Sequence, residues 1–366
     1  MSKALIDAAP VGPPPELLAY YTEENRPGPQ PAGEGILSAV GSTPLVGLVK
    51  FLPDAHFRLY AKLEGLNPGG SSKDRPALSV IRRGIETGAI GPDTTIVESS
   101  SGNLGIGLAQ ACAYFGLRLI CVVDAKTRPQ NIRLMEAYGA ETDIILDPDP
   151  ETGEYLQARL NRVQTLLSTV ENSFWPNQYA NTYNPVAHHR TMREVLTQLD
   201  GRVDYLFCAT STCGTLRGCV EYVREHNLAT KVVAVDALGS VIFGGPKAAR
   251  LIPGHGAAVR PQLYRPDLAD EVVWVSDLEC VVGCRRLANS EAVLAGGSSG
   301  AVAMAVEKMR DDIPRDAVCV AIFPDRGERY LDTIYSDEWV AQHFGEVSHL
   351  WAARGKEQRC LTTYCS

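Results

Sequence analysis

The chain has 366 residues, of which 45% are hydrophobic and 21% charged, which is enough to build a full core in one large or two ordinary domains. Its formal net charge of −8 argues against a nucleic-acid or anionic-membrane surface, because both need a basic patch. No run of 18 or more apolar residues is present, and the first 15 residues lack the basic and apolar regions of a secretory signal. We therefore expect a cytoplasmic protein.

The ten cysteines are scattered and form no CxxC pair, so neither a zinc knuckle nor a thioredoxin-like site is expected. Several of them, such as Cys121 and Cys319, lie in apolar runs and are interpreted as small buried hydrophobes in a reducing compartment. His188 and His189 are expected to precede a helix. Because adjacent side chains point to different faces, they are not expected to bind a metal.

Residues 1–34 are rich in proline, which predicts a flexible or surface-draped arm, and residues 346–366 form a polar tail. Between them, short apolar runs alternate with helical periodicity. The predicted strands are 59–63, 95–97, 119–123, 143–146, 205–209, 232–235, 272–275 and 318–322. The predicted helices include 104–114, 130–138, 156–167, 216–224 and 301–310. This alternation indicates a parallel sheet that is covered by helices on both faces.

Ligands of open α/β sheets bind where strands end and helices begin, so four loops rich in glycine and serine are candidate sites. The first, 67–77, follows the strand 59–63 and presents Lys73 at the start of a helix. The positive end of the helix dipole disfavours a charge on this amine, and a neutral amine is what Schiff-base chemistry requires. A solvated lysine beside a tight turn is the alternative interpretation.

The second loop, 98–105, places serine hydroxyls and backbone N–H groups at a helix N-terminus, where they form an anion site suited to an amino-acid carboxylate. In the same loop Asn103 offers an amide donor to a phenolate oxygen. An ordinary helix cap explains the pattern equally well.

The third loop, 209–215, suits a phosphate monoester, because it joins hydroxyls and backbone donors to a helix dipole without the ending of a Walker loop. In the fourth loop, 295–300, the hydroxyl of Ser298 could bond a pyridine nitrogen without protonating it. Such a weak electron sink favours β-elimination. Taken singly, each loop is also compatible with a plain helix start.

Together, the order and spacing of the four loops resemble the cofactor loops of the cysteine synthase and cystathionine beta-synthase family, which are fold-type II pyridoxal-phosphate (PLP) enzymes. The resemblance spans about residues 41–339. It implies two three-layer α/β/α domains of the tryptophan synthase beta-like architecture, with the cofactor between them, and a homodimer. The larger, PLP-binding domain would hold residues 35–73 and 181–345, and the smaller, mobile domain residues 74–180.

The same resemblance implies a role for each loop. Lys73 would link covalently to pyridoxal 5'-phosphate and then act as general acid and base, Asn103 would bind the phenolic oxygen, and Ser298 the ring nitrogen. The phosphate would be held by Ser211, Thr212, Cys213, Gly214 and Thr215. The substrate carboxylate would be held by Ser100, Ser101 and Gly102.

One loop departs from the usual family pattern, since residues 211–215 read Ser-Thr-Cys-Gly-Thr where cysteine synthases have Gly-Thr-Gly-Gly-Thr. Segments 73–77, 177–181, 235–244 and 324–332 are more similar to N-(2-amino-2-carboxyethyl)-L-glutamate synthases of 2,3-diaminopropionate biosynthesis, which serves siderophore or antibiotic production. The implied reaction eliminates phosphate from O-phospho-L-serine and adds the amine of L-glutamate to the resulting aminoacrylate.

The second substrate distinguishes the alternatives. Sulfide needs no specificity pocket, whereas the two carboxylates of glutamate require arginine, hydroxyls or helix N-termini. The candidates are Arg159, Tyr179 and Ser211, although Arg159 could equally lie on a solvated helix face. Arg326 would either assist the phosphoserine phosphate or fix its own loop. A cysteine synthase that uses sulfide with O-acetyl- or O-phosphoserine, and a non-catalytic binding partner that keeps the fold, remain alternatives.

Overall fold

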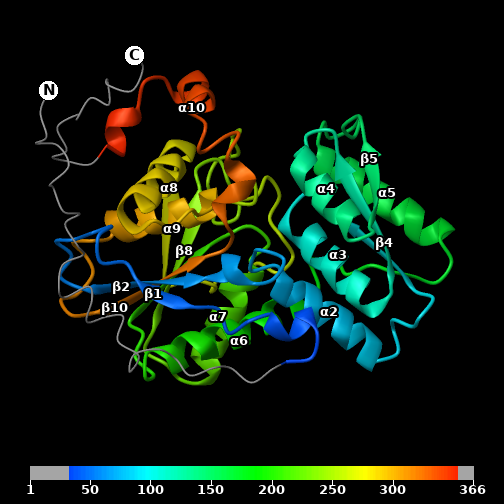
Figure 1. Ribbon diagram of the computed structural model, residues 1–366, viewed down its shortest axis with the longest axis horizontal. Helices are drawn as coiled ribbons and strands as arrows, with labels where there is room; N and C mark the ends of the chain where they lie inside the picture. The colour runs from blue at the N-terminus through cyan, green and yellow to red at the C-terminus, as the bar shows by residue number, and fades with distance from the viewer. Residues whose placement is uncertain (1–32, 353–366) are drawn as a thin grey trace, which may run out of the picture. The chain divides into compact units, whose positions relative to one another are not determined.

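The computed structural model describes residues 33–352. The chain divides into two compact units, Met1–Gly35 and Ile36–Ser366, and the second contains two sheets that are covered by helices (Figure 1). The predicted arm and most of the predicted tail lie outside the described residues. Of the tail, residues 346–352 are described, and there Trp351 packs against the hydrophobic core. None of the described helices is long and apolar enough to cross a membrane.

The larger sheet has six strands in the order β1-β2-β10-β7-β8-β9. They are β1 (Leu45–Gly47), β2 (Arg58–Leu63), β7 (Tyr205–Ala209), β8 (Lys231–Ala237), β9 (Glu271–Val275) and β10 (Val318–Phe323). β1 pairs antiparallel to β2, and every other pairing in this sheet is parallel. The carboxyl ends of the five parallel strands therefore lie at one edge.

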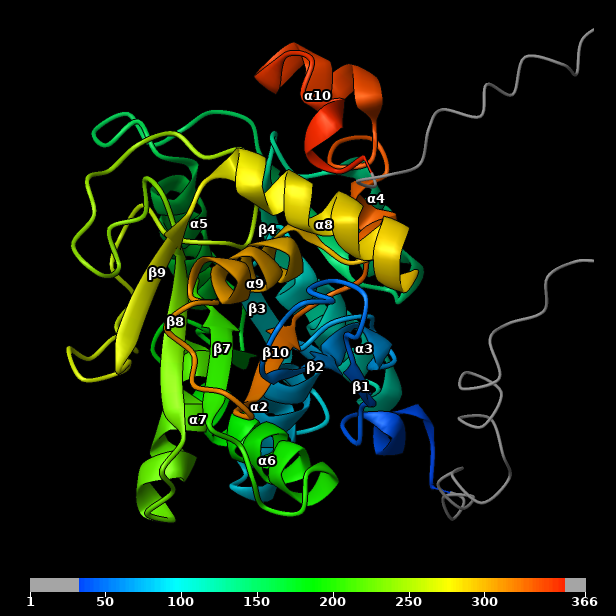
Figure 2. The same ribbon diagram turned by 90° about the vertical axis from the view of Figure 1, so that its left-hand side faces the viewer.

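Helices cover both faces of this sheet because its central strands are apolar on both sides. They are α6 (Tyr183–Gln198), α7 (Gly214–Glu225), α8 (Asp277–Glu291), α9 (Gly297–Lys308) and α10 (Asp337–Phe344). On β7, Phe207 packs in the core with α8 and α9, whereas its neighbour Leu206 packs with α6 and α7. Figure 2 shows α8 and α9 on the side of the sheet opposite α6 and α7.

The smaller sheet has four parallel strands in the order β5-β4-β3-β6. They are β3 (Thr95–Ser99), β4 (Arg118–Asp124), β5 (Glu141–Ile145) and β6 (Ser173–Phe174). One face packs against α2 (Asp74–Glu86), α3 (Asn103–Phe115) and α4 (Pro129–Ala137), and the other against α5 (Tyr155–Thr169). Successive side chains of β4 point to opposite faces of the sheet. Cys121 packs in the core with α2, α3 and α4, and Val122 packs in the core with α5.

The predicted fold class is confirmed, because each sheet is the middle of an α/β/α sandwich. The strands of the larger sheet lie within 45–63 and 205–323 and those of the smaller within 95–174, while the predicted domain boundaries stay a prediction. Two short strands, β1 and β6, were not expected, because two or three residues are too few to show a period.

The position expected for the two histidines is wrong. Both lie inside α6, which begins at Tyr183 because Pro185 fits its first turn. His188 is fully buried, whereas His189 lies 3.7 Å from both Glu221 and Glu225. The eight cysteines of the described residues are all free and buried, as expected for small hydrophobes.

Candidate active site

A cavity of about 680 Å³ lies where the carboxyl ends of strands from both sheets meet. Its wall includes the site residues predicted from the sequence, with the exception of Arg326. These are Lys73, Ser100, Ser101, Gly102, Asn103, Arg159, Tyr179, Ser211, Thr212, Cys213, Gly214, Thr215 and Ser298. The chain thus brings together four loops, of which the first and the last are more than 200 residues apart in sequence.

Lys73 is the N-cap residue of α2, and its side chain is partly buried in the cavity wall. Burial lowers the pKa of the Lys73 amine, although the carboxylates of Asp325 and Glu64 oppose the shift. The neutral form of the amine is therefore favoured relative to an exposed lysine. This is the form that attacks a carbonyl carbon.

Buried charged side chains hold the start of α2 in place. Arg75 Nε donates to Glu64 Oε2 at 2.6 Å, and its Nη2 donates to Glu194 Oε2 on α6 at 2.7 Å. The carboxylate of Asp74 accepts from the backbone of Gly69 at 2.5 Å, and burial raises the pKa of Asp74 to about 7. These contacts hold both flanks of Lys73.

The second loop ends at the N-terminus of α3, where Gly102 is the N-cap residue. Ser100 Oγ accepts from Gly105 N at 2.9 Å, which leaves its proton free to donate toward the cavity. Asn131 Nδ2 donates to the carbonyl of Ser101 at 3.0 Å and so fixes the turn. A helix N-terminus with hydroxyls beside it is a site for a carboxylate.

Asn103 is held by partners that the sequence did not single out. Its Nδ2 donates to Asp325 Oδ2 at 2.8 Å, and its Oδ1 accepts from a guanidinium nitrogen of Arg329. Tyr330 Oη donates to the same Asp325 oxygen at 2.5 Å. Asp325 Oδ1 is buried and has no hydrogen-bond partner within the described part of the chain. The amide of Asn103 is therefore locked in one orientation, with one N–H left to donate.

The sequence signals for these partners were their position directly after β10, at the carboxyl end of a strand, and the resemblance carried by segment 324–332, neither of which pointed to a contact with Asn103. In that segment the sequence pointed to Arg326. Its side chain is 51% exposed, lies 3.5 Å from Glu328 and is not part of the cavity wall, whereas Arg329 is.

The third loop has a left-handed backbone at Cys213 (φ 66°), the N-cap residue of α7. The thiol is buried, which raises the pKa of Cys213 to about 12, so it is a packed group and not a nucleophile. Gly214 is required, because a Cβ there would lie 2.1 Å from Asn184 Oδ1. Thr215 Oγ1 lies 3.2 Å from Nε2 of His188, whose burial keeps the pKa well below its usual value and the ring neutral.

The fourth loop opens α9, with Gly296 as N-cap and the 9%-exposed Ser298 in the first turn. A Cβ at Gly296 would lie 1.9 Å from Asp325 Oδ1, so only glycine allows the carboxylate to approach this closely. The donor set fits PLP: a buried amine, the Asn103 amide, the Ser298 hydroxyl and a second helix N-terminus for the phosphate.

The wall that faces the smaller sheet carries Arg159, on α5, and Tyr179. Arg159 is 8% exposed, so the alternative of a solvated helix face is wrong. Its Nε lies 3.2 Å from Asp124 Oδ2 but has no partner with hydrogen-bond geometry among residues 33–352. The phenol of Tyr179 stays protonated at neutral pH, because burial raises its pKa.

The cavity wall is rich in cations although the whole chain is acidic. Six basic side chains line it, Lys73, Lys126, Arg128, Arg159, Arg250 and Arg329, against the three acids Asp124, Glu154 and Asp325. Five of the basic groups, Lys73, Lys126, Arg128, Arg250 and Arg329, form no ion pair with any described acid. Such a wall is suited to anionic ligands.

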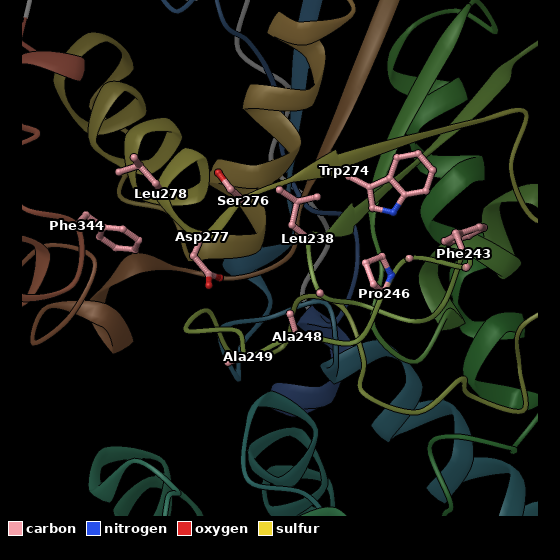
Figure 3. Close-up of a pocket in the computed structure, with 13 residues that line it drawn as sticks. Leu238, Phe243, Pro246, Ala248, Ala249, Trp274, Ser276, Asp277, Leu278 and Phe344 are labelled. Atoms are coloured by element: carbon pink, nitrogen blue, oxygen red, sulfur yellow. The ribbon is translucent and has the colours of Figure 1, made fainter.

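A second cavity, of about 750 Å³, lies beside the loop after β8 and is lined mainly by apolar groups such as Leu238, Phe243 and Trp274 (Figure 3). Its one acid, Asp277, accepts from the backbone of Leu251 and Ile252 at 2.8 and 3.2 Å. Its wall carries no lysine, arginine, histidine or cysteine. The catalytic groups therefore belong to the first cavity.

Comparison with known proteins agrees with this site. Residues 36–325 match the family described as pyridoxal-phosphate dependent enzyme. The O-acetylserine dependent cystathionine beta-synthase from Helicobacter pylori is 31% identical, with a TM-score of 0.77, over 83% of this chain and 99% of that one. O-ureido-L-serine synthase is 31% identical, with a TM-score of 0.77, over 85% and 100%.

A cysteine synthase from Entamoeba histolytica is 28% identical, with a TM-score of 0.78, over 91% of this chain and 94% of that one. The family match covers well over half of the chain, and together with the similar enzymes it supports an enzyme and not a non-catalytic binding partner. The chain therefore belongs to the pyridoxal-phosphate dependent enzymes, and it is a transferase that catalyses β-replacement on an amino acid.

Proposed function

We propose that the protein replaces the phosphate of O-phospho-L-serine by the amine of L-glutamate and so forms N-(2-amino-2-carboxyethyl)-L-glutamate, a precursor of 2,3-diaminopropionate. The observation that carries this proposal is the cation-rich cavity wall, in which a buried arginine, Arg159, lies beside Tyr179. Both proposed substrates are anionic, since phosphoserine bears a phosphate and a carboxylate and glutamate bears two carboxylates. Sulfide would need none of these groups.

The cofactor site follows from the four loops. Lys73 would hold PLP covalently, Asn103 would donate to its phenolic oxygen and Ser298 to its ring nitrogen. Ser211, Thr212, Cys213, Gly214 and Thr215 would bind its phosphate at the start of α7. Bound PLP supplies an electron sink that stabilises negative charge at the substrate's Cα.

The first half of the reaction needs a base and an anion site. Ser100, Ser101 and Gly102 would hold the carboxylate of phosphoserine at the start of α3. The amino group of phosphoserine would displace the amine of Lys73 from its covalent link, and the released neutral amine would then take the proton from Cα. The electron pair left on Cα would expel phosphate from Cβ. The guanidinium groups of the cavity wall without an ion pair would stabilise the departing dianion.

In the second half, Arg159, Tyr179 and Ser211 would bind the carboxylates of glutamate and aim its amine at Cβ. Lys73 would return the proton to Cα. Because Arg159 Nε lacks a hydrogen-bond partner among the described residues, an incoming carboxylate would satisfy a buried donor instead of displacing a bond.

A cysteine synthase is the second candidate, and one of the similar proteins is a cysteine synthase by name, while another depends on O-acetylserine. Competition between nucleophiles separates the two functions. Holoenzyme is given O-phospho-L-serine with L-glutamate and sulfide together, and both products are measured by mass spectrometry. We expect the glutamate adduct to dominate. A product that is cysteine alone, with O-acetylserine the better first substrate, would support the second candidate.

A further inference from the structure

Glu98 is a fully buried carboxylate at the end of β3, directly before the loop that contains Ser100 and Gly102. Its Oε1 accepts from Ser99 N at 2.8 Å and from Trp175 Nε1 at 3.2 Å. Its Oε2 accepts from Gln178 N at 3.3 Å. One side chain thus joins two segments that are about 75 residues apart in sequence.

Both segments belong to the cavity wall. From the first, residues 100–103 line the cavity and would hold the carboxylate of the first substrate. From the second, Gln178 and Tyr179 line it, and Tyr179 belongs to the proposed second-substrate site. Gln178 Nε2 adds a direct bond to the carbonyl of Ser99 at 3.1 Å. The position of Glu98 therefore affects both substrate sites at once.

Among residues 33–352, few titratable groups interact with Glu98. They are Arg159 from α5, Tyr179 from its own loop and Cys121 from β4, and Asp124 lies beyond Arg159. Burial raises the pKa of Tyr179 and raises that of Cys121 to about 12, so both stay protonated at neutral pH.

Burial also raises the pKa of Glu98 to about 7, against three hydrogen bonds and the nearby Arg159, which favour the charged form. Glu98 therefore gains or loses its proton close to neutral pH, unlike an exposed glutamate. A buried acid that titrates there, next to a substrate-binding arginine, is placed to respond to a bound anion.

The guanidinium of Arg159 lowers the pKa of Glu98, and it already lies beside Asp124. A substrate carboxylate bound at Arg159 would be the third negative charge, after Glu98 and Asp124, around this single guanidinium. The ionised form of Glu98 would become less favourable, so its pKa would rise further and the site would take up a proton. With a neutral Glu98, the anion meets less repulsion.

We propose that Glu98 is a positioning residue that takes up a proton when an anionic second substrate binds at Arg159, so that the site binds this substrate more tightly below neutral pH than above it. This inference rests on the proposed role of Arg159 in the proposed function. Substrate binding would be coupled to the uptake of a proton, and the carboxylate of Glu98 would take it up.

The direct test is calorimetry of the holoenzyme with glutarate, a dicarboxylate that lacks the reacting amine. Titrations at pH 7.5 in two buffers of different ionisation enthalpy give the number of protons taken up. We expect up to about one proton per site in the wild type and none in Glu98→Gln. The wild-type affinity should fall as pH rises from 6.5 to 8.5, by at most about tenfold per pH unit. Arg159→Ala should remove this binding.

A kinetic test uses the ratio of kcat/KM for L-glutamate between the wild type and Glu98→Gln, because titration of the glutamate amine then cancels. The ratio should fall as pH rises through about 7, and the change should lie in KM and not in kcat. Glu141→Gln is the matched control, since Glu141 is an exposed acid of the same sheet, paired with Arg118. This control should follow the wild type.

The outcomes separate the two proposals. Glutarate binding that depends on Arg159 but takes up no proton in the wild type would overturn the inference and leave the proposed function standing. The wild-type buffer comparison decides this even if Glu98→Gln does not fold. If neither glutarate nor glutamate binds in a manner that depends on Arg159, both the inference and the role of Arg159 fail.

Discussion

At the scale of single residues, the account depends on polar groups that are buried around the cavity and held in one orientation. Arg159 is the clearest case, because a buried guanidinium lines the cavity with an unsatisfied nitrogen among the described residues. Buried charges are costly unless they have a partner. Asp124 compensates part of the charge of Arg159, and we propose that a carboxylate of the second substrate compensates the rest.

Arg159→Ala should raise the KM for L-glutamate by about 10- to 100-fold, because a hydrogen bond to a charged group contributes about 1.5–3 kcal/mol. The rate of phosphate release from O-phospho-L-serine in a single turnover without glutamate should change little. The matched control is Arg162→Ala on the same helix, where Arg162 pairs with Asp143 and is 42% exposed. Equal KM values for the two variants would contradict the role of Arg159.

Asp325 holds the amide of Asn103, and it accepts from Tyr330 as well. Asp325→Asn should weaken PLP binding by about tenfold and shift the visible absorbance of the bound cofactor, because the Asn103 amide loses its charged acceptor. Equilibrium dialysis and absorbance spectra check this. Tyr330→Phe removes one bond to the same oxygen and should have a smaller effect. An unchanged spectrum and affinity in Asp325→Asn would show that Asn103 needs no such support.

The proposed cofactor residues that the sequence identified share one property: they lie in loops with a distinctive composition. Lys73, Asn103, Ser298 and residues 211–215 all follow strands and open helices, and all line the cavity. Asp325 and Arg329 were missed as site residues because their role depends on contacts with Asn103, more than 220 residues away in sequence. The burial of Arg159 was equally undetermined, since periodicity does not say which neighbour covers a helix face.

At the scale of elements, the strands that were predicted are those with runs of buried, mostly β-branched residues, such as β4 and β8. The short β1 and β6 carry no such run. The helix starts matter most for the site, because α3, α7 and α9 each direct an N-terminus at the cavity. Their first backbone N–H groups have no partner within the helix and are available to anions.

The end of α8 offers a test of the backbone account. Ala292, its exposed C-cap residue, has a left-handed backbone (φ 56°), a conformation that costs a non-glycine residue about 1–2 kcal/mol. Ala292→Gly should therefore raise the free energy of unfolding by up to about 1 kcal/mol, measured by urea denaturation. Ala288→Gly, inside the same helix, should lower it by about 1 kcal/mol. The same sign for both would contradict the assigned helix end.

At the scale of the whole molecule, Lys73, the proposed catalytic lysine, is linked to the larger sheet by a buried network of charges. Arg75 on α2 contacts Glu64 after β2 and Glu194 on α6, and Lys62 lies 2.9 Å from the same Glu194. All of these groups are largely removed from solvent, so the charges must compensate one another.

Arg75→Met should lower the free energy of unfolding by about 3–5 kcal/mol, because it leaves two buried carboxylates with too few cations. Chemical denaturation followed by circular dichroism measures this change. Arg83→Met on the same helix is the control. Its ion pair with Glu86 is about half exposed, and its loss should change the free energy by less than about 1 kcal/mol. Similar losses in both variants would show that the buried network contributes little.

The resemblance also implies a homodimer, which we propose as the active state, and light scattering of the purified holoenzyme checks it. The bounds of the two domains stay a prediction in the same way. What the fold already fixes is that one cavity receives loops from both sheets.

The central claim is that this cavity performs β-replacement with two anionic substrates. The most direct test follows the absorbance of the holoenzyme during addition of O-phospho-L-serine and then of L-glutamate, with free phosphate measured in parallel. We predict a spectral change with release of one phosphate per site, followed by return to the starting spectrum on addition of glutamate. A spectral change that requires O-acetylserine, and that sulfide reverses but glutamate does not, would contradict the claim and identify a cysteine synthase.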